Sequence, residues 1–106
     1  MLDRNAIIEI LRMIEDPELH INIVDLGLIY QIDLQTLPQD QYQYAVCIQI
    51  TLTRPDCPMG DVILMEIRQQ LEVIPELKDI TLELVWEPPW TQNFISEEGK
   101  LLLGLL

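Results

Sequence analysis

Positive charge is scarce in this sequence. Six Lys and Arg residues stand against eighteen Asp and Glu, which gives a formal net charge of −12 at pH 7. Because proteins bind phosphate backbones mainly through Lys and Arg, this balance disfavours nucleic acid as a partner. A KH-type RNA-binding domain has a comparable succession of elements, but its G-x-x-G loop is absent here. We therefore expect no nucleic-acid partner.

Long apolar runs are also missing. No stretch reaches the roughly 18 apolar residues that a membrane-spanning helix needs, and Met1-Leu2-Asp3 lacks the basic start and apolar stretch of a signal peptide. We therefore expect no membrane partner and a cytoplasmic location. With 106 residues and a hydrophobic fraction of 49%, the chain has the composition of one compact domain, predicted to span residues 1–106.

Cysteine and histidine are nearly absent, with only Cys47, Cys57 and His20 in the chain. Without a Cys-x-x-Cys or His-x-x-x-His pair, familiar spacings cannot assemble a closed four-ligand zinc or iron–sulfur site. Nothing marks a disulfide scaffold, so both cysteines are expected to be free thiols. No serine–histidine–aspartate order, phosphate-cradling glycine loop or dinucleotide fingerprint is present. We therefore expect that the chain is not an enzyme.

Three segments have helical periodicity. The first is predicted to begin at the N-cap Asp3 and to stop at Pro17, with an apolar stripe of Ile7, Ile10, Leu11 and Ile14. The second is predicted to start at Cys57 and Pro58 and to end at Pro75, with an apolar stripe of Ile63, Leu64, Ile67, Leu71 and Ile74. Ser96 and the two glutamates after it predict a short last helix.

Three other segments alternate apolar and polar residues at strand spacing. They cover residues 24–34, 44–52 and 80–86. The polar stretch QTLPQDQYQ between the first two predicts a hairpin turn, and Cys47 is expected to point away from the buried face with Gln49 and Thr51. Pro88 and Pro89 end the third strand because proline gives no ladder hydrogen bond.

The predicted order is therefore α-β-β-α-β-α. Strands with one buried face predict an α+β fold, a two-layer α/β sandwich in which helices pack on one face of a small three-stranded mixed sheet. The second helix joins its flanking strands by a crossover, which is expected to be right-handed. The apolar end LLLGLL is expected to be buried in the core, with a homodimer contact as the alternative.

Cys57 lies where a helix start favours the thiolate, because unsatisfied N–H groups and the positive end of the dipole point there. Asp56 and Asp61 oppose this effect, and only Arg54 adds a positive charge nearby. The residues alone thus leave a functional thiol and a cysteine that only fills a helix start as alternatives. Cys47, in mid-strand, is expected to be a small packing residue.

The stretch EDPELH places Glu15, Asp16, Glu18 and His20 in one short loop. Such a group can orient or deprotonate a nearby nucleophile. The alternative, which the residues alone favour, is a solvated acidic turn that caps local backbone.

Three motifs together resemble one known family. DPELHINIVDLGLIY, TLTRPDCPMG and VWEPPWTQNFISEEGKLLLG stand in the order and rough spacing of the PaaD/SufT-like iron–sulfur cluster assembly proteins. The resemblance covers nearly the whole chain. It implies a two-layer α/β fold and a role in maturing iron–sulfur proteins, either in general cluster assembly or for one oxygenase of phenylacetate breakdown.

The resemblance also implies a site. The reactive cysteine of the family falls on Cys57, its DPE motif on Asp16, Pro17 and Glu18, and the threonine of its T-x-x-x-C segment on Thr53. We expect the Cys57 thiolate to hold iron, a transient iron–sulfur cluster or a thiol adduct during transfer, supported by the other three polar residues. The expected partners are iron–sulfur carrier and client proteins. The alternative is a non-catalytic adaptor that docks carriers and clients through its acidic surface and the segment EPPWTQNF.

Overall fold

The computed structural model describes residues 2–56 and 60–105. Its elements follow the predicted order, with one additional 3-10 helix before the last helix. They are α1 (Arg4–Leu11), β1 (Ile29–Leu37), β2 (Asp40–Ile50), α2 (Gly60–Glu72), β3 (Leu77–Leu84), η1 (Gln92–Phe94) and α3 (Glu97–Leu103). Within the described residues, no helix has the length and apolar character needed to cross a membrane.

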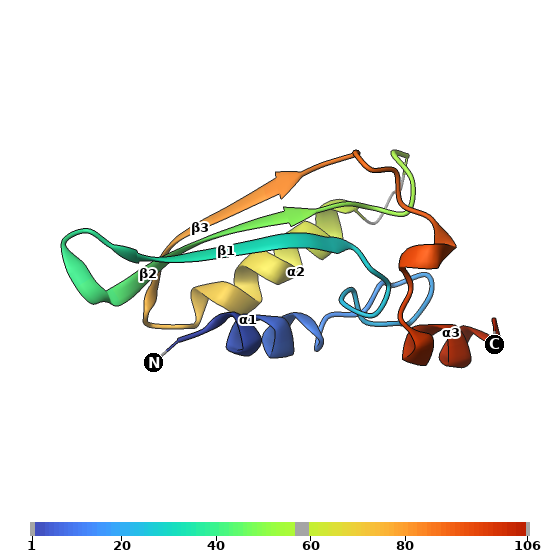
Figure 1. The fold of residues 1–106 in the computed structure, drawn as a ribbon, viewed down its shortest axis with the longest axis horizontal. Coiled ribbons are helices and arrows are strands. Elements are labelled where there is room, and N and C mark those ends of the chain that lie inside the picture. The colour runs from blue at the N-terminus through green and yellow to red at the C-terminus, as the bar shows by residue number, and fades with distance from the viewer. Residues whose placement is uncertain (1, 57–59, 106) are drawn as a thin grey trace.

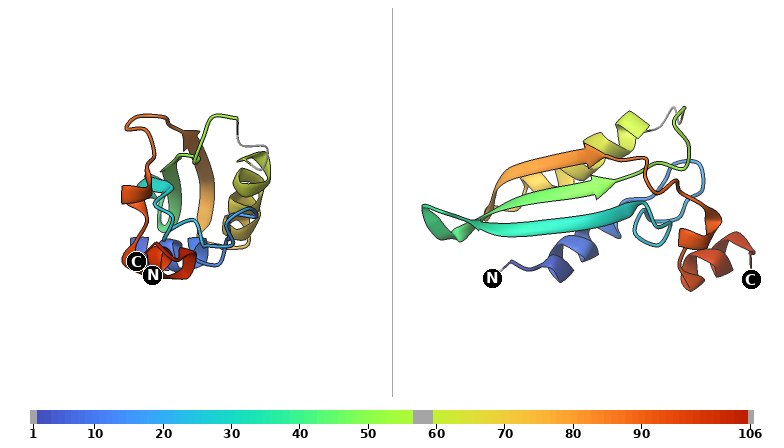
Figure 2. Two further views of the ribbon diagram at one scale, coloured as in Figure 1. Left: turned by 90° about the vertical axis from the view of Figure 1, so that its right-hand side faces the viewer. Right: turned by 45° about the horizontal axis from the view of Figure 1, so that its top comes forward.

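The sheet has the strand order β1-β2-β3. β1 pairs with β2 in the antiparallel sense, and β3 pairs with β2 in the parallel sense, so the sheet is mixed as predicted. Figure 1 shows α1 and α2 on the same side of the sheet, whereas α3 lies beyond its end, and the views of Figure 2 agree. The other face of the sheet is left open by these helices.

The core lies between the covered face of the sheet and the two long helices. The alternation predicted for the second strand is confirmed, because all five of its inward residues are buried: Tyr44, Val46, Ile48, Ile50 and Leu52. The helices contribute the fully buried Ile7, Leu11, Ile63, Ile67 and Leu71. Full burial of one such side chain contributes about 1.5–3 kcal/mol, so this layer contact holds the two-layer architecture together.

The N-caps are as predicted. The Asp3 side chain accepts a hydrogen bond from the Ala6 N–H at 2.8 Å, and the Ser96 hydroxyl accepts one from the Gly99 N–H at 3.1 Å. The predicted end of the first helix at Pro17 is wrong, because α1 ends at Leu11. The N–H groups of Met13 and Ile14 donate to carbonyls three residues earlier, which is a turn rather than a continued α-helix. The expected helix start at Cys57 and Pro58 lies outside the described residues.

The prediction for the first strand is wrong in its first half. Residues 24–27 form a turn, and β1 begins at Ile29 and continues to Leu37. The hairpin turn is correspondingly shorter than predicted, with only Pro38 and Gln39 between the strands. The apolar alternation misled because Leu26 and Leu28 are fully buried although they lie in a loop.

Two apolar segments that were expected to be buried are partly exposed to solvent. At the end of the third strand, Leu84 and Trp86 are 41% and 38% exposed. The expected burial of the C-terminal LLLGLL is wrong for Leu101 and Leu102, which are 64% and 73% exposed on α3. Among the leucines of this segment that the structure describes, only Leu103 packs against the core. The chain leaves α3 through Gly104 in the left-handed conformation, with φ of 76°. The homodimer contact stays a prediction.

Candidate functional site

Three loops gather at one end of the sheet. Residues 12–28 lead into β1, residues 51–56 follow β2, and residues 85–91 follow β3, all at the end drawn on the right of Figure 1 and again in Figure 2. Asp16, Glu18 and Thr53 therefore lie at the same end of the molecule. Cys57 lies outside the described residues, and the position of its thiol relative to these groups stays a prediction.

Asp16 shapes the first of these loops. Its side chain is buried, with the residue only 3% exposed, and its Oδ1 accepts hydrogen bonds from the N–H groups of Glu18 at 2.8 Å and Leu19 at 3.0 Å. Its own carbonyl accepts the His20 N–H at 2.8 Å. These bonds hold the turn that brings His20 to a φ of 59° and leaves Glu18 exposed. Asp16 thus caps local backbone as the alternative stated, but it is buried rather than solvated. Its supporting role at Cys57 stays a prediction.

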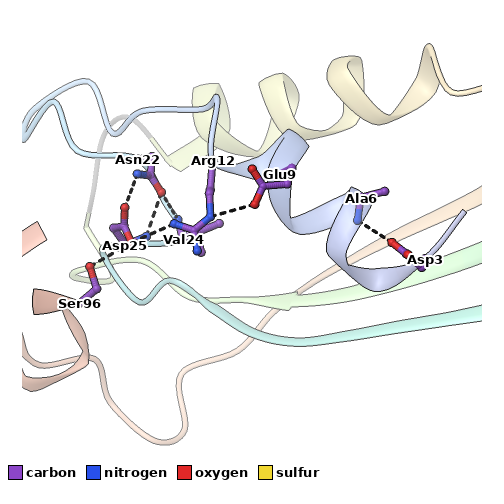
Figure 3. A network of polar contacts seen from close by, with 8 residues as sticks. All are labelled: Asp3, Ala6, Glu9, Arg12, Asn22, Val24, Asp25 and Ser96. Atoms are coloured by element: carbon purple, nitrogen blue, oxygen red, sulfur yellow. Dashed lines mark hydrogen bonds and ion pairs between the residues drawn. The ribbon is translucent and has the colours of Figure 1, made fainter. Parts of the chain in front are cut away.

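A polar network around Asp25 ties this loop to the C-terminal helix (Figure 3). The buried carboxylate accepts hydrogen bonds from Arg12 at 3.1 Å, Asn22 at 2.7 Å and the Ser96 hydroxyl at 3.0 Å. Burial by itself raises the pKa of Asp25, but the hydrogen bonds from Asn22 and Ser96 and the charge of Arg12 outweigh it, so the pKa is lowered. The ionised form therefore stabilises the loop in its folded position.

Asp25 also acts through its main chain, because its carbonyl accepts the Ser96 N–H at 2.7 Å. The sequence pattern did not single out Asp25, since its hydrogen-bond partners lie up to 71 positions away. Asp25 lies on the polar side of the predicted strand. From the sequence alone, a buried carboxylate at this position cannot be distinguished from one that faces solvent.

The loop after β2 begins with a buried threonine. Thr51 is fully buried, unlike the half-buried Cys47, and its N–H donates to the Leu28 carbonyl at 2.8 Å. The expectation that these two side chains share a face stays a prediction. Thr53 is half-buried, and beyond it Arg54 and Asp56 form an exposed ion pair with Nε and Oδ1 3.4 Å apart. The positive charge of Arg54 partly offsets that of Asp56, which precedes Cys57 in the sequence.

The segment after β3 folds back over the sheet end and borders a shallow, open groove. The Trp90 indole N–H donates to the Leu26 carbonyl at 2.7 Å, and the Tyr30 hydroxyl donates to the Pro88 carbonyl at 2.7 Å. The Tyr30 and Phe94 rings meet edge to face, with centroids 5.7 Å apart. The groove between these segments has a volume of about 500 Å³ and is also lined by Gly27, Gln49 and Glu87.

Cys47 is not the packing residue that was expected. It is half-buried on the open face of the sheet, where its thiol donates to Oε1 of Glu83 at 2.9 Å. The hydrogen bond to Glu83, followed by burial and by the charges of Glu83 and Asp33, raises the pKa of this thiol. Cys47 therefore stays a protonated thiol under conditions in which an ordinary cysteine starts to ionise.

The residues that the structure describes contain no group of three or more His, Cys, Asp or Glu side chains placed to hold a metal ion. A cluster handled by this part of the chain would therefore need ligands from elsewhere, as the cysteine and histidine count already indicated.

The fold and this loop-lined sheet end define a small two-layer α+β domain. The sequence profile of the family described as "Iron-sulfur cluster assembly protein" matches residues 4–84. The chain belongs to this family, which confirms the resemblance drawn from its three motifs.

Known relatives and structures agree with this membership. The chain is 39% identical over 94 residues to the Fe-S protein maturation auxiliary factor SufT of Staphylococcus aureus (strain USA300), covering 88% of this chain and 99% of that protein. A domain of unknown function from Bacillus anthracis has a similar structure, with a TM-score of 0.81 and 33% identity over 96% of this chain and 92% of that one. The iron–sulfur cluster carrier protein of Deinococcus radiodurans is 32% identical over 79 residues, which cover 74% of this chain and 21% of the carrier.

Proposed function

We propose that this chain is an iron–sulfur cluster assembly or transfer factor that is not an enzyme and in which Cys57 is the working thiol. Membership of the family supports the general role, and a relative of nearly equal length is a maturation auxiliary factor. One structural observation supports the choice of residue. The loop that carries Thr53 and leads to Cys57 leaves the sheet at the same end as the loop of Asp16 and Glu18.

The proposed chemistry is ligand exchange. The Cys57 thiolate forms a coordination bond to an iron of the cargo while a ligand of the donor protein leaves, and the cargo keeps its oxidation state. Because the described residues supply no further group of metal ligands, the remaining positions on iron stay with the donor, the acceptor or a small thiol. A single thiolate per chain suits transfer better than storage. Glu18, exposed beside the turn that Asp16 holds, is placed to steer a partner.

The proposed partners are cluster carriers and client proteins. The similarity to about a fifth of a much longer cluster carrier indicates that a domain of this type occurs joined to carrier sequence in one chain. A separate chain of the same type would meet its carrier through a non-covalent contact instead. A cluster carrier is therefore the first partner to test.

The test uses a bacterial strain that lacks its own factor of this family, with the activity of an iron–sulfur enzyme as readout. We expect Cys57→Ala to leave the chain folded and to abolish the recovery of enzyme activity. Cys47→Ala is the matched control, since that cysteine lies on the open face, bound to Glu83, and should support full recovery. Full recovery with Cys57→Ala would remove the thiol from the proposal.

An adaptor without chemistry of its own is the second candidate. It is favoured by the acidic charge and by the exposure of Glu87, Pro88 and Pro89 in the segment that folds over the sheet end. A thiol-selective probe followed by mass spectrometry separates the two. In an adaptor, Cys57 would label no faster than an ordinary exposed cysteine, whereas a working thiolate labels faster.

A further inference from the structure

The groove at the sheet end has features of a built recognition site. Its volume of about 500 Å³ falls in the range of roughly 300–1,000 Å³ that is typical of ligand sites. One wall is aromatic, formed by the edge-to-face pair of Tyr30 and Phe94, with Phe94 38% exposed. The hydrogen bond from Tyr30 to Pro88 holds this wall against the segment that carries Glu87.

A one-residue bulge in β1 shapes this wall. The pairing of β1 with β2 shifts between Ile29 and Gln31, which leaves Tyr30 as the extra residue. Bulges redirect a side chain relative to the regular alternation of a strand. Here the redirected side chain is the one that meets both Pro88 and Phe94.

The charge of the groove has one sign. Glu87 is exposed on its rim and forms no hydrogen bond or ion pair with the residues the structure describes. The pKa of Tyr30 is raised by burial and by the charge of Glu87, and the hydrogen bond of Thr51 only partly opposes this. The effect of Glu87 shows that its carboxylate lies near the Tyr30 hydroxyl. Glu83 pairs in register with Gln49, another lining residue, so a second carboxylate lies one strand away. No lining residue is Lys or Arg.

We propose that this groove docks an arginine side chain from an extended segment of a partner protein. The guanidinium pairs with the Glu87 carboxylate, while its planar face and the aliphatic stem pack on the exposed ring of Phe94. Arginine fits this combination better than lysine, because its flat guanidinium stacks on aromatic rings and binds a carboxylate in a fork. A net charge of −12 attracts such a segment before contact is made.

This inference rests on the proposed function only for the kind of partner, a carrier or client protein. The proposed docking contacts are made by Glu87 and Phe94, which can be substituted without changing Cys57, so docking and cluster transfer can fail separately. Cys57→Ala, which tests the proposed function, is expected to leave docking unchanged.

The experiment is an NMR titration of the ¹⁵N-labelled full chain under reducing conditions. The probe is acetyl-Gly-Arg-Gly-amide, and the matched control is the same peptide with citrulline, which keeps the shape of arginine without its charge. Glu87→Gln tests the carboxylate. Glu72→Gln removes the same charge from the end of α2, on the opposite side of the sheet.

We expect the arginine peptide to shift the amide signals of Gly27, Tyr30, Gln49 and Phe94 above all others. Glu87→Gln should weaken its binding by about three- to fivefold, as for an exposed charge pair, and Glu72→Gln and Cys57→Ala should not. Equal binding of the citrulline peptide would overturn the proposal, because the groove would then not select a cation. Shifts spread over the acidic surface, with equal effects of Glu87→Gln and Glu72→Gln, would overturn it as well.

Discussion

Gly27→Ala is the substitution that tests most sharply how the sheet end is assembled. Gly27 has a φ of 78°, in the left-handed region. A Cβ atom at this position would lie 2.3 Å from the Phe94 carbonyl oxygen and 2.7 Å from the Phe94 Cβ. The segment after β3 can therefore close on the first loop only because residue 27 has no side chain.

The structure allows the loss of stability to be divided into two parts. The left-handed conformation costs a non-glycine residue about 1 kcal/mol. The second part comes from the movement of Phe94 that relieves the clash. This movement weakens the edge contact of Phe94 with Tyr30, which contributes about 0.5–1.5 kcal/mol. It also strains the nearby hydrogen bond of Trp90 to Leu26, which contributes about 0.5–1.5 kcal/mol. We expect Gly27→Ala to lower the free energy of unfolding by about 2–4 kcal/mol in total.

Gly104→Ala is a matched control. Gly104 has a nearly identical φ of 76°, but its added Cβ meets no atom of the described residues within 4 Å apart from its chain neighbours. It should lose no more than about 1 kcal/mol, the conformational part alone. Urea unfolding followed by Trp fluorescence measures both variants. Equal losses would show that the contact of Gly27 with Phe94 contributes nothing and would refute this reasoning.

Two further predictions concern titrating groups. Because folding lowers the pKa of Asp25, its ionised form adds stability above the unfolded value near 3.8, and this stability is lost as the pH falls through the folded value. Asp25→Asn should therefore cost about 1–2 kcal/mol at pH 7 and less in acid, and a cost that stays the same in acid would contradict the assigned role of the carboxylate in pH-dependent unfolding. The exposed Asp79→Asn should cost no more than about 0.5 kcal/mol at pH 7. Glu83 raises the pKa of Cys47, so Glu83→Gln should speed the alkylation of Cys47 by iodoacetamide at pH 8. The rate is measured in a Cys57→Ala chain, in which Cys47 is the one remaining thiol. An unchanged rate would contradict the assigned cause.

The parts of the fold predicted correctly are those with local causes. The caps at Asp3 and Ser96 are formed by hydrogen bonds to N–H groups three residues away, and the alternation of β2 reflects one buried face. Patterns of this kind are visible in a short window of sequence. The element order and the layer architecture followed from them.

The errors arise where distant segments meet. Residues 24–28 alternate like a strand, yet a network that joins Asp25 to Ser96, 71 positions away, folds them into a loop. Gly27 inside that alternation was the one available signal, since a glycine within a strand pattern often marks a close backbone approach. The groove was not predicted for the same reason, as its Tyr30 and Pro88 contact spans 58 positions.

For the candidate site, the structure places the loops, whereas the roles of their residues stay predictions. The structure brings the loops of Asp16, Glu18 and Thr53 to one end of the sheet. The Asp16 carboxylate shapes its loop by accepting hydrogen bonds from the N–H groups of Glu18 and Leu19. A sequence cannot distinguish this role from a catalytic one, because both use the same carboxylate. The function of Cys57 stays a prediction that rests on its motif and on the family.

The most direct test of that prediction is cluster transfer with purified components under anaerobic conditions. A cluster-loaded carrier and an apo client are mixed with no addition, with the wild-type chain, with Cys47→Ala or with Cys57→Ala, and the rate at which client activity returns is measured. We predict that the wild-type and Cys47→Ala chains accelerate the transfer equally and that Cys57→Ala leaves it at the rate without addition. Acceleration by Cys57→Ala equal to that of the wild-type chain would contradict the account.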